Sequence, residues 1–265
     1  MNSRINLINA SFSYDGKTDI FKDLSCEITT DNIFCILGPN GIGKSTLLNG
    51  IMNLHPLSAG RVTLDDIDIK DYRHLELAKK IAYIPQSYQM AFPFKVLDIV
   101  LMGRNPHLND MNQPSKEDYD KVMEAICALE LEPYIERPVT QLSGGQLQMV
   151  MLARAIAQEA DFLIMDEPTS HLDYGKQMET LKIIAKMHDR GVGVIFTSHN
   201  PDQAFLVCDR VAIMNHKTFV AVGRPEDVIT EEALTEIYKT SVHILKYGEE
   251  GEGRVVVPAD RKIRR

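Results

Sequence analysis

The segment GPNGIGKST at residues 38–46 constrains the fold most, because it separates a strand-like run from a helical pattern. The run NIFCILG (32–38) is short and apolar, as in a buried parallel strand, and KSTLLNGIMNL (44–54) is typical of a helix. Glycines between two such elements let backbone N–H groups converge on an anion, and the helix N-terminus adds unpaired donors. The segment therefore predicts a phosphate-binding loop, and a bare turn without a ligand is the alternative.

The loop also satisfies the pattern G-x-x-x-x-G-K-[ST], with Gly38 as its first residue and Ser45 as its last. In this pattern the lysine, here Lys44, contacts the β- and γ-phosphates of a nucleotide. The hydroxyl oxygen of Ser45 is expected to bind Mg²⁺, an ion that prefers oxygen ligands. The pattern thus predicts a nucleotide site that includes a magnesium ion.

Two adjacent carboxylates follow the apolar segment FLIM at 162–165. Neighbouring strand residues point to opposite faces, so Asp166 and Glu167 need different roles unless the chain bends where the strand ends. We expect Asp166 to serve the Mg²⁺ shell and Glu167 to polarise an attacking water. A strand that simply ends in solvated acids is the alternative, which the preceding phosphate-binding loop disfavours.

Composition narrows the classes of function. The chain has 265 residues and a formal net charge of −8, which does not favour nucleic-acid binding. Its four cysteines include no C-x-x-C pair, so neither a zinc site nor a redox motif is indicated. The N-terminus has no signal-peptide pattern, and no run approaches the ~18 apolar residues of a membrane helix. We therefore expect a cytosolic chain whose membrane role comes from a partner.

The rest of the chain alternates between strand-like and helical segments. Strand character is expected at 4–9, 24–29, 61–69, 81–86, 161–168 and 191–199, and a hairpin at 209–223. Helical spacing is expected at 96–104, 115–131, 144–160 and 174–189, with Ser115 and Asp118 in a capping arrangement. The alternation implies parallel crossovers, and thus an α/β fold with a helical insertion at about 88–160. Residues 246–265 are expected to form a charged tail whose last residues are mobile.

The segment LSGGQ at 142–146 distinguishes this chain from most proteins that carry a phosphate-binding loop and a strand-end aspartate, such as kinases, GTPases and helicases. A serine and two glycines at a helix start form a further site that can receive phosphate. A glycine pair used for packing or capping is the alternative.

In this order and at this spacing, the motifs resemble those of the ATP-binding subunit of an ABC transporter over nearly the whole chain. The resemblance implies an α/β fold with a P-loop NTPase core (ABC ATPase), an antiparallel β subdomain and an inserted helical subdomain, within a domain at 1–245. It also implies that ATP and Mg²⁺ bind. The ATP-binding positions, with Tyr14 stacking on adenine, are then Tyr14, Gly38, Asn40, Gly41, Gly43, Lys44, Ser45 and Thr46.

The resemblance also assigns the remaining motifs. Gln86 matches a glutamine that contacts Mg²⁺ and senses the membrane partner, Glu167 the catalytic glutamate, and His199 the switch histidine near the γ-phosphate. Asp173 matches the D-loop aspartate, in a segment where His171 replaces the frequent alanine or glycine. The signature motif, which acts in trans on the nucleotide of a second copy, is Leu142, Ser143, Gly144, Gly145 and Gln146. A head-to-tail homodimer with two ATP molecules between the chains is therefore expected.

One position departs from the family pattern. Leu147 stands where the family commonly has arginine or lysine, directly after the signature glutamine. The lost charge can alter contacts within the helical subdomain. We do not expect it to remove ATP binding, because this side chain is not expected to touch nucleotide.

A weaker resemblance concerns the type of transporter. The segment FPFKVLDIVLMGRNPHL (92–108) and the ending GRVVVP (253–258) resemble ATPases of metal-chelate importers, for iron–siderophore, haem, cobalamin or the related molybdate. This resemblance implies separate membrane permease subunits, whose coupling helix docks on residues 86–108, and indirectly a substrate-binding protein. The chain would then lie at the cytoplasmic face of the membrane as a peripheral subunit. The basic end RKIRR (261–265) is expected to be solvated rather than bound to lipid headgroups.

Three alternatives stay open at this point. One is an ABC subunit for another substrate class. Another is an ABC-type ATPase that acts on nucleic acid or ribosomes, disfavoured by the acidic charge and the single ATP cassette. The third is a P-loop kinase or GTPase, disfavoured by the signature motif, Glu167 and His199.

Overall fold

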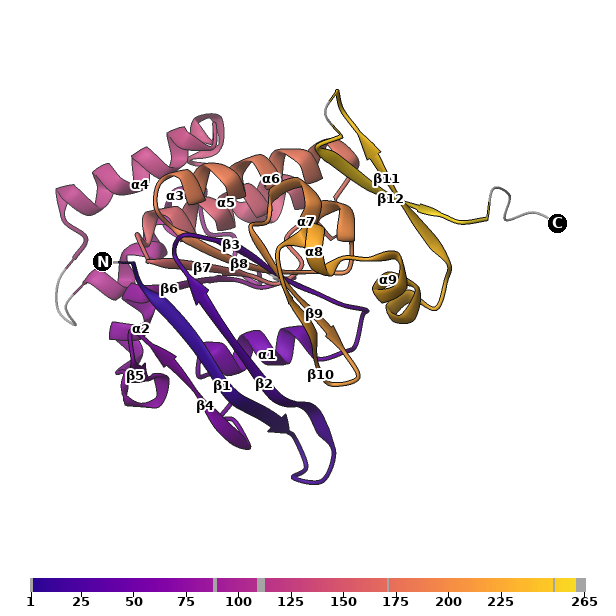
Figure 1. The fold of residues 1–265 in the computed structure, drawn as a ribbon. Coiled ribbons are helices and arrows are strands. Elements are labelled where there is room, and N and C mark those ends of the chain that lie inside the picture. The colour runs from indigo at the N-terminus through magenta and orange to yellow at the C-terminus, as the bar shows by residue number, and fades with distance from the viewer. Residues whose placement is uncertain (1, 88–89, 109–112, 171, 250, 261–265) are drawn as a thin grey trace. The chain divides into compact units, whose positions relative to one another are not determined.

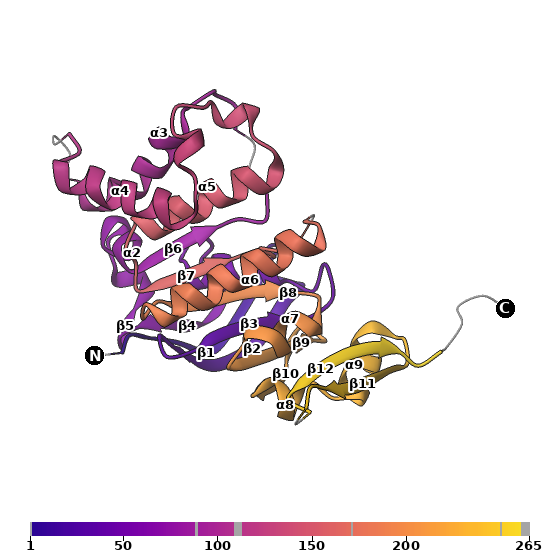
Figure 2. The ribbon, with the colours of Figure 1, turned by 90° about the horizontal axis from the view of Figure 1, so that it is seen from above.

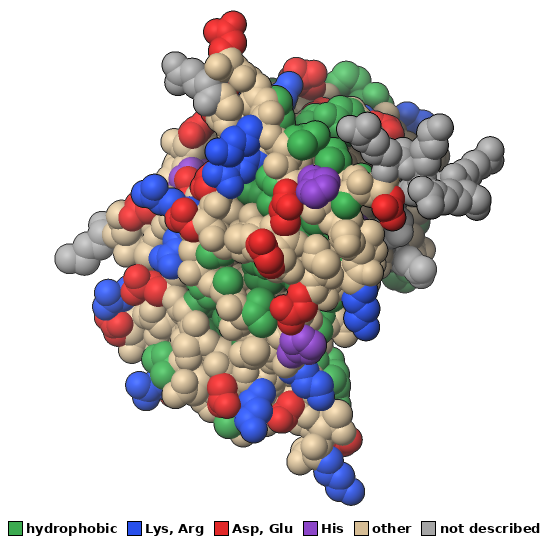
Figure 3. Space-filling view, turned by 45° about the vertical axis from the view of Figure 1, so that its right-hand side comes forward, with side chains coloured by type: hydrophobic (Ala, Val, Ile, Leu, Met, Phe, Trp, Pro, Cys, Tyr) green, Lys and Arg blue, Asp and Glu red, His purple; other side chains and the backbone are tan. Residues whose placement is uncertain are grey.

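The computed structural model describes residues 2–87, 90–108, 113–170, 172–249 and 251–260. The chain forms two compact units, of which one combines residues 1–71 with 181–265 and the other comprises residues 72–180. The basic end at 261–265 and His171 lie outside the described residues. On the face drawn in Figure 3, the described acidic and basic side chains are mixed and neither sign forms a continuous field.

An antiparallel sheet occupies the first part of unit one. Its strands lie in the order β2 (Asp19–Thr29), β1 (Arg4–Ser13), β4 (Ala59–Leu64) and β5 (Ile67–Asp68), and Figure 1 shows β1 and β2 as its long pair. The single strand expected at 61–69 is wrong, because the chain turns at Asp65 and Asp66. Their φ angles of 51° and 67° match the left-handed pair that closes a two-residue hairpin.

A second sheet in unit one carries the phosphate-binding loop. Strand β3 (Ile33–Leu37) is buried throughout and pairs in parallel with β8 (Gly193–Ser198) and β9 (Arg210–Asn215). Strand β10 (Thr218–Gly223) returns antiparallel to β9, as the hairpin prediction required. Helices α1 (Lys44–Ile51) and α7 (Pro201–Val207) follow β3 and β8. The apolar run at 32–38 is a buried strand, as its composition predicts.

The C-terminal part of unit one is more regular than the sequence indicated. After α8 (Pro225–Val228) and α9 (Glu231–Tyr238), strands β11 (Val242–Tyr247) and β12 (Gly253–Pro258) pair antiparallel. Much of the expected tail therefore belongs to a hairpin, in which the β-branched run at 255–257 forms one strand.

Unit two contains most of the helices. It consists of α2 (His74–Lys80), β6 (Ile81–Ile84), α3 (Val96–Leu101), the 3₁₀ helix η2 (Met102–His107), α4 (Lys116–Ala128), α5 (Gly144–Ala157) and β7 (Phe162–Met165). Short 3₁₀ turns at Glu132–Tyr134 and Val139–Gln141 join α4 to α5, and α6 (Tyr174–Asp189) runs from unit two into unit one. Strands β6 and β7 pair in parallel. The helix expected at 96–104 ends at Leu101, and the chain continues as the 3₁₀ helix that contains Pro106.

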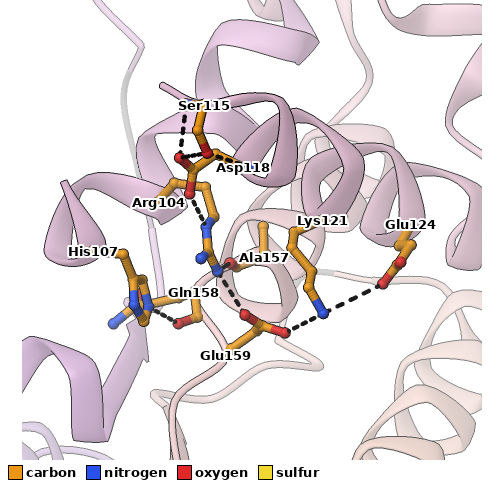
Figure 4. A network of polar contacts seen from close by, with 9 residues as sticks. All are labelled: Arg104, His107, Ser115, Asp118, Lys121, Glu124, Ala157, Gln158 and Glu159. Atoms are coloured by element: carbon orange, nitrogen blue, oxygen red, sulfur yellow. Dashed lines mark hydrogen bonds and ion pairs between the residues drawn. The ribbon is translucent and has the colours of Figure 1, made fainter. Parts of the chain in front are cut away.

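A buried polar network holds η2 to two helices of unit two (Figure 4). The Arg104 guanidinium lies 2.9 Å from Asp118 Oδ1 and 2.9 Å from Glu159 Oε2, and it donates to the carbonyl of Ala157 at the end of α5. The predicted capping pair is confirmed, since Asp118 accepts from the Ser115 amide and hydroxyl. These bonds from Ser115, and then the hydrogen bond from Arg104, lower the pKa of Asp118 to about 2.

Candidate functional site

The phosphate-binding loop is shaped by two glycines that accept no side chain. A Cβ on Gly38 would lie 2.6 Å from the Met214 carbonyl oxygen. Gly43 has a φ of 107°, and a Cβ there would lie 2.7 Å from Ile20 Cγ2. The loop can therefore follow this path only with glycine at both positions.

Lys44 lies inside the loop. Its ammonium donates to the carbonyl oxygens of Gly38 at 2.9 Å and Pro39 at 3.1 Å, and the residue is only 4% exposed. Asn40, Gly41 and Ser45 are exposed, and Thr46 is half-buried. A buried cation surrounded by an exposed rim of amides and a hydroxyl suits an incoming phosphate.

Tyr14 lies beside the start of α1. Its hydroxyl is 3.4 Å from Thr46 Oγ1, and the residue is 66% exposed. Its ring meets Phe12 edge to face at 4.8 Å and lies 6.1 Å from the His55 ring. The contact with buried Phe12 holds the exposed Tyr14 ring, and a ring held in this way can stack on a base. Sequence reasoning found Tyr14 and missed His55, which no motif marks.

The two carboxylates follow β7 in unit two, and the chain bends between them. Asp166 is 4% exposed, and its amide donates to the Ile84 carbonyl at 3.0 Å. Glu167 has a φ of 46°, in the left-handed region that non-glycine residues rarely adopt. Its carbonyl accepts from the amide and the hydroxyl of Ser170, at 3.0 Å and 2.8 Å. The opposite-face rule for strands therefore does not separate these two carboxylates.

Gln86 and Glu167 meet directly. The Gln86 amide donates to Glu167 Oε2 at 3.2 Å, from the segment that follows β6 to the turn that follows β7. The sequence predicted each residue but not the pair. Nearby, burial and then the Asp166 charge raise the pKa of Tyr83 to about 12.

The signature segment forms the N-terminus of α5. Ser143 and Gln146 make a reciprocal capping box, in which the Ser143 amide donates to Gln146 Oε1 at 2.9 Å. The pattern S-x-x-Q could have predicted this box. Ser143 and Gly144 are exposed, and a Cβ on Gly144 would meet no described atom within 4 Å. The capping alternative is thus present in part, but packing among the described residues does not explain why position 144 is glycine.

The other predicted positions are also found. Asp173 Oδ1 accepts from the Lys176 amide at 2.9 Å, at the start of α6. His199 follows β8 and is exposed, and its carbonyl accepts from the Tyr238 hydroxyl at 2.7 Å. Leu147 is half-buried in α5, and its neighbour Gln148 is buried and donates to the Pro168 carbonyl. Leu142 is half-buried as well.

The site residues fall into two sets. Tyr14, the loop at 38–46 and His199 belong to unit one, whereas Gln86, the signature segment, Asp166, Glu167 and Asp173 belong to unit two. Direct contacts between side chains join Tyr14 to Thr46 in the first set and Gln86 to Glu167 in the second. The structure therefore builds a phosphate cradle in one unit and a carboxylate–amide pair in the other.

Comparison with known proteins assigns this combination to a family. The family model for ABC transporters matches residues 21–170, which include the loop, the signature segment and both carboxylates. The chain belongs to the ABC transporter family. It is an ATPase of that family, with its α/β P-loop NTPase fold and its binding of adenine nucleotides.

Curated relatives of the ABC family are similar along most of the chain. A molybdate import ATP-binding protein of Haemophilus influenzae is 33% identical, covering 90% of this chain and 89% of its own. A manganese transport system ATP-binding protein of Listeria innocua is 35% identical, with coverages of 88% and 95%. A hemin import ATP-binding protein of Rhodococcus jostii is 31% identical, with coverages of 93% and 84%.

Solved structures of ABC proteins share the fold. One, of a metal-chelate type ABC transporter in an inward-facing conformation, has a TM-score of 0.86 at 30% identity and covers 98% of this chain and 99% of its own. Another is a dimeric ATP-binding cassette in a post-hydrolysis state with ADP and phosphate. It has a TM-score of 0.72 at 26% identity, with coverages of 83% and 98%. Within the described part of the ABC chain, none of the helices is long and apolar enough to span a bilayer.

Proposed function

We propose that this chain is the ATP-hydrolysing subunit of an importer, and that it works as a homodimer beneath separate permease subunits at the cytoplasmic face of the membrane. The observation that carries the proposal is the buried Lys44 ammonium within a glycine-shaped loop, in a chain that also pairs Gln86 with Glu167. The importer class rests on relatives whose names concern molybdate, manganese and hemin.

Nucleotide binding is assigned to unit one. The exposed Tyr14 ring stacks on adenine, and Lys44 binds the β- and γ-phosphates in place of the loop carbonyls that it now contacts. The amides of the loop and the start of α1 receive the remaining phosphate oxygens. The residues that line this site are Tyr14, Gly38, Asn40, Gly41, Gly43, Lys44, Ser45 and Thr46.

The chain also offers ligands that suit Mg²⁺. The hydroxyl of Ser45, the amide oxygen of Gln86 and the carboxylate of Asp166 are hard oxygen donors, the class this ion prefers. Asp166 is 4% exposed, so its charge is little screened by water. When bound, the ion neutralises charge on the β- and γ-phosphates.

Hydrolysis is assigned to Glu167, assisted by Gln86 and His199. The Gln86 amide donates to one oxygen of this carboxylate at 3.2 Å, and a carboxylate has about four lone-pair sites with which it can also orient a water. Glu167 has a left-handed backbone conformation, and the Ser170 hydroxyl donates to its carbonyl. Together these features hold the backbone from which the Glu167 side chain extends. His199, exposed at the end of β8, contacts the γ-phosphate.

The homodimer is assigned through the signature segment. Ser143 and Gly144 are exposed at a helix N-terminus, and space around Gly144 is open among the described residues. A phosphate held by the loop of a second copy can approach these groups. Asp173 is assigned to couple the two copies across the same interface. A dimeric relative with ADP and phosphate supports the arrangement.

The permease partner is assigned to residues 86–108 of an ATPase domain at 1–245. Most of this segment belongs to the helical insertion proposed at about 88–160. Three large apolar side chains there are exposed, with 65% for Phe92, 41% for Phe94 and 38% for Met102. Exposed aromatic and methionine side chains in one short segment suit an amphipathic coupling helix. Positions 88–89 of this segment lie outside the described residues.

The transported substrate is proposed to be a metal chelate, such as a ferric siderophore, haem or a cobalamin-like molecule delivered by a binding protein. The support is the segment at 92–108 and the likeness to a metal-chelate type transporter. The test is uptake by vesicles that contain the ATPase with its permease. Uptake of a metal chelate supports the proposal, uptake of molybdate supports the related molybdate type of the same importers, and uptake of manganese alone contradicts it.

The enzymatic proposal is tested with two substitutions. Glu167→Gln should bind ATP with unchanged affinity and lose turnover by about 100-fold or more, because the water is no longer polarised. Lys44→Ala should weaken ATP binding, since the buried cation of the loop is removed. Wild-type turnover in Glu167→Gln, or unchanged ATP affinity in Lys44→Ala, would refute the assigned roles.

A further inference from the structure

The turn that follows His199 is held by hydrogen bonds among its own residues. After the histidine, the Asn200 amide donates to Ser198 Oγ at 3.0 Å, and Ser198 donates to Gln203 Oε1 at 3.0 Å. The Asp202 amide then donates to Asn200 Oδ1 at 3.0 Å. These bonds fix the turn from β8 into α7, and none of them includes the backbone carbonyl of His199.

Tyr238 holds that carbonyl. It is the last residue of α9, and its hydroxyl donates to the His199 carbonyl oxygen at 2.7 Å. Tyr238 is half-buried although His199 is exposed. Burial raises the pKa of the Tyr238 phenol, so the group remains a neutral donor at any physiological pH.

The C-terminal hairpin makes a second connection to the same turn. The Val256 amide of β12 donates to Asp202 Oδ1 at 2.8 Å, and the Arg254 guanidinium lies 5.7 Å from the Phe205 ring of α7. Figure 2 shows α7, α9 and β12 in one region of unit one. Strand β11 is joined to α9, because the Ile244 amide donates to Glu231 Oε1 at 2.8 Å. Helix α9 and the hairpin therefore form one block that contacts the turn after His199.

We propose that Tyr238 is a positioning residue for His199, and that α9 with the C-terminal hairpin sets the orientation of this histidine towards the γ-phosphate. The inference rests on the proposed function, in which His199 contacts that phosphate. The Tyr238 hydroxyl bonds the His199 carbonyl from a different element, α9, so this contact restricts rotation of the peptide next to the imidazole. Positioning of this kind acts on the reaction and not on nucleotide binding.

The first test is Tyr238→Phe, which removes one hydroxyl and keeps the ring. We expect kcat for ATP hydrolysis to fall about 3- to 10-fold, the range set by the loss of one hydrogen bond. KM and nucleotide affinity should stay within about 2-fold, because binding is made by other residues. Tyr247→Phe is the matched control, since Tyr247 is exposed on β11 and should leave every parameter unchanged.

Two outcomes would overturn the proposal. One is an unchanged kcat in Tyr238→Phe. The other is a fall in kcat that comes with an equal rise in KM or a matching loss of folded protein on thermal melting, which indicates a structural role alone. His199→Ala separates this inference from the proposed function. If His199→Ala loses turnover and Tyr238→Phe does not, only the positioning role fails. If His199→Ala keeps wild-type turnover, both fail.

Discussion

Two glycine-containing segments of unit two, 103–104 and 143–145, differ in what surrounds them. A Cβ on Gly103 would lie 2.3 Å from the Arg154 carbonyl oxygen, and Arg104 is 5% exposed with three acceptors around it. At Gly144, by contrast, a Cβ would meet no described atom within 4 Å, and Ser143 is exposed. Contacts within the chain explain the first segment. In the second, the capping box accounts for Ser143, whereas the described contacts do not explain why position 144 is glycine.

The contrast separates stability from activity. A residue whose type is dictated by its own neighbours affects folding when it changes. A residue whose type is not explained by its own neighbours affects binding or catalysis at the surface when it changes. Residues 103–104 resemble a feature of metal-chelate importers, yet their contacts show that they anchor η2 to α4 and α5. The signature segment is instead exposed, and in the proposed function it receives the nucleotide of a second copy.

Arg104→Met should have the largest effect. It leaves Asp118 as a buried carboxylate without its cation, so the free energy of unfolding should fall by about 3 kcal/mol. Denaturant titration measures the change. Lys95→Met is the matched control, since the Lys95–Glu136 pair is exposed and its loss should not be measurable. Equal stability of the two variants would contradict the structural role of Arg104.

Gly144→Asp should have the next largest effect, on turnover. A carboxylate at this position repels the phosphates of the second copy's nucleotide, so kcat should fall by about 100-fold. The melting temperature should not fall, because an acid in the first turn of a helix is favourable and glycine is not. Parallel ATPase and melting measurements check both. Full activity, or a large loss of stability, would show that the segment does not serve a partner.

Alanine at each glycine gives a sharper comparison with no charge involved. Gly103→Ala should lower the free energy of unfolding by about 1–3 kcal/mol, since its Cβ overlaps a backbone carbonyl. Gly144→Ala should leave stability unchanged or slightly raised. If denaturant titration ranks the two variants in the opposite order, the distinction between the segments is wrong.

Leu147→Arg should have the smallest effect. Leu147 is half-buried on α5, and arginine restores the residue that the family commonly has there. The free energy of unfolding should change by less than about 0.5 kcal/mol, as for most surface substitutions. ATP affinity should not change, because no contact with nucleotide is expected. Altered affinity in a filter-binding assay would place this side chain nearer the nucleotide than proposed.

Sequence reasoning succeeded where one residue type serves one local purpose. The apolar run at 32–38, the Ser115 cap and the glycines of the loop each follow from local physical chemistry, and all are found. It failed where distant segments meet. The Gln86–Glu167 pair joins residues that are 81 positions apart. Tyr238 lies 39 positions from His199, and no periodicity marks either contact.

The end of the chain shows the same limit. Glycine and charged residues at 248–254 suggested a tail, but the valines at 255–257 pair with β11. Short strands depend on a partner for their hydrogen bonds, so composition alone cannot place them. At Asp65–Asp66 the sequence did carry a turn signal that the prediction overlooked, because aspartate tolerates the left-handed conformation of tight turns. These two residues split the one expected strand into a hairpin.

The central claim is that two copies of this chain enclose ATP between the loop of one and the signature segment of the other. The most direct test is the mass in solution of Glu167→Gln with Mg-ATP, measured by light scattering. The account predicts a nucleotide-dependent shift from the chain mass of 29.9 kDa to twice that value. It also predicts that adding Gly144→Asp abolishes the shift. A variant that binds ATP and stays at 29.9 kDa, or dimerises equally with Gly144→Asp, would contradict it.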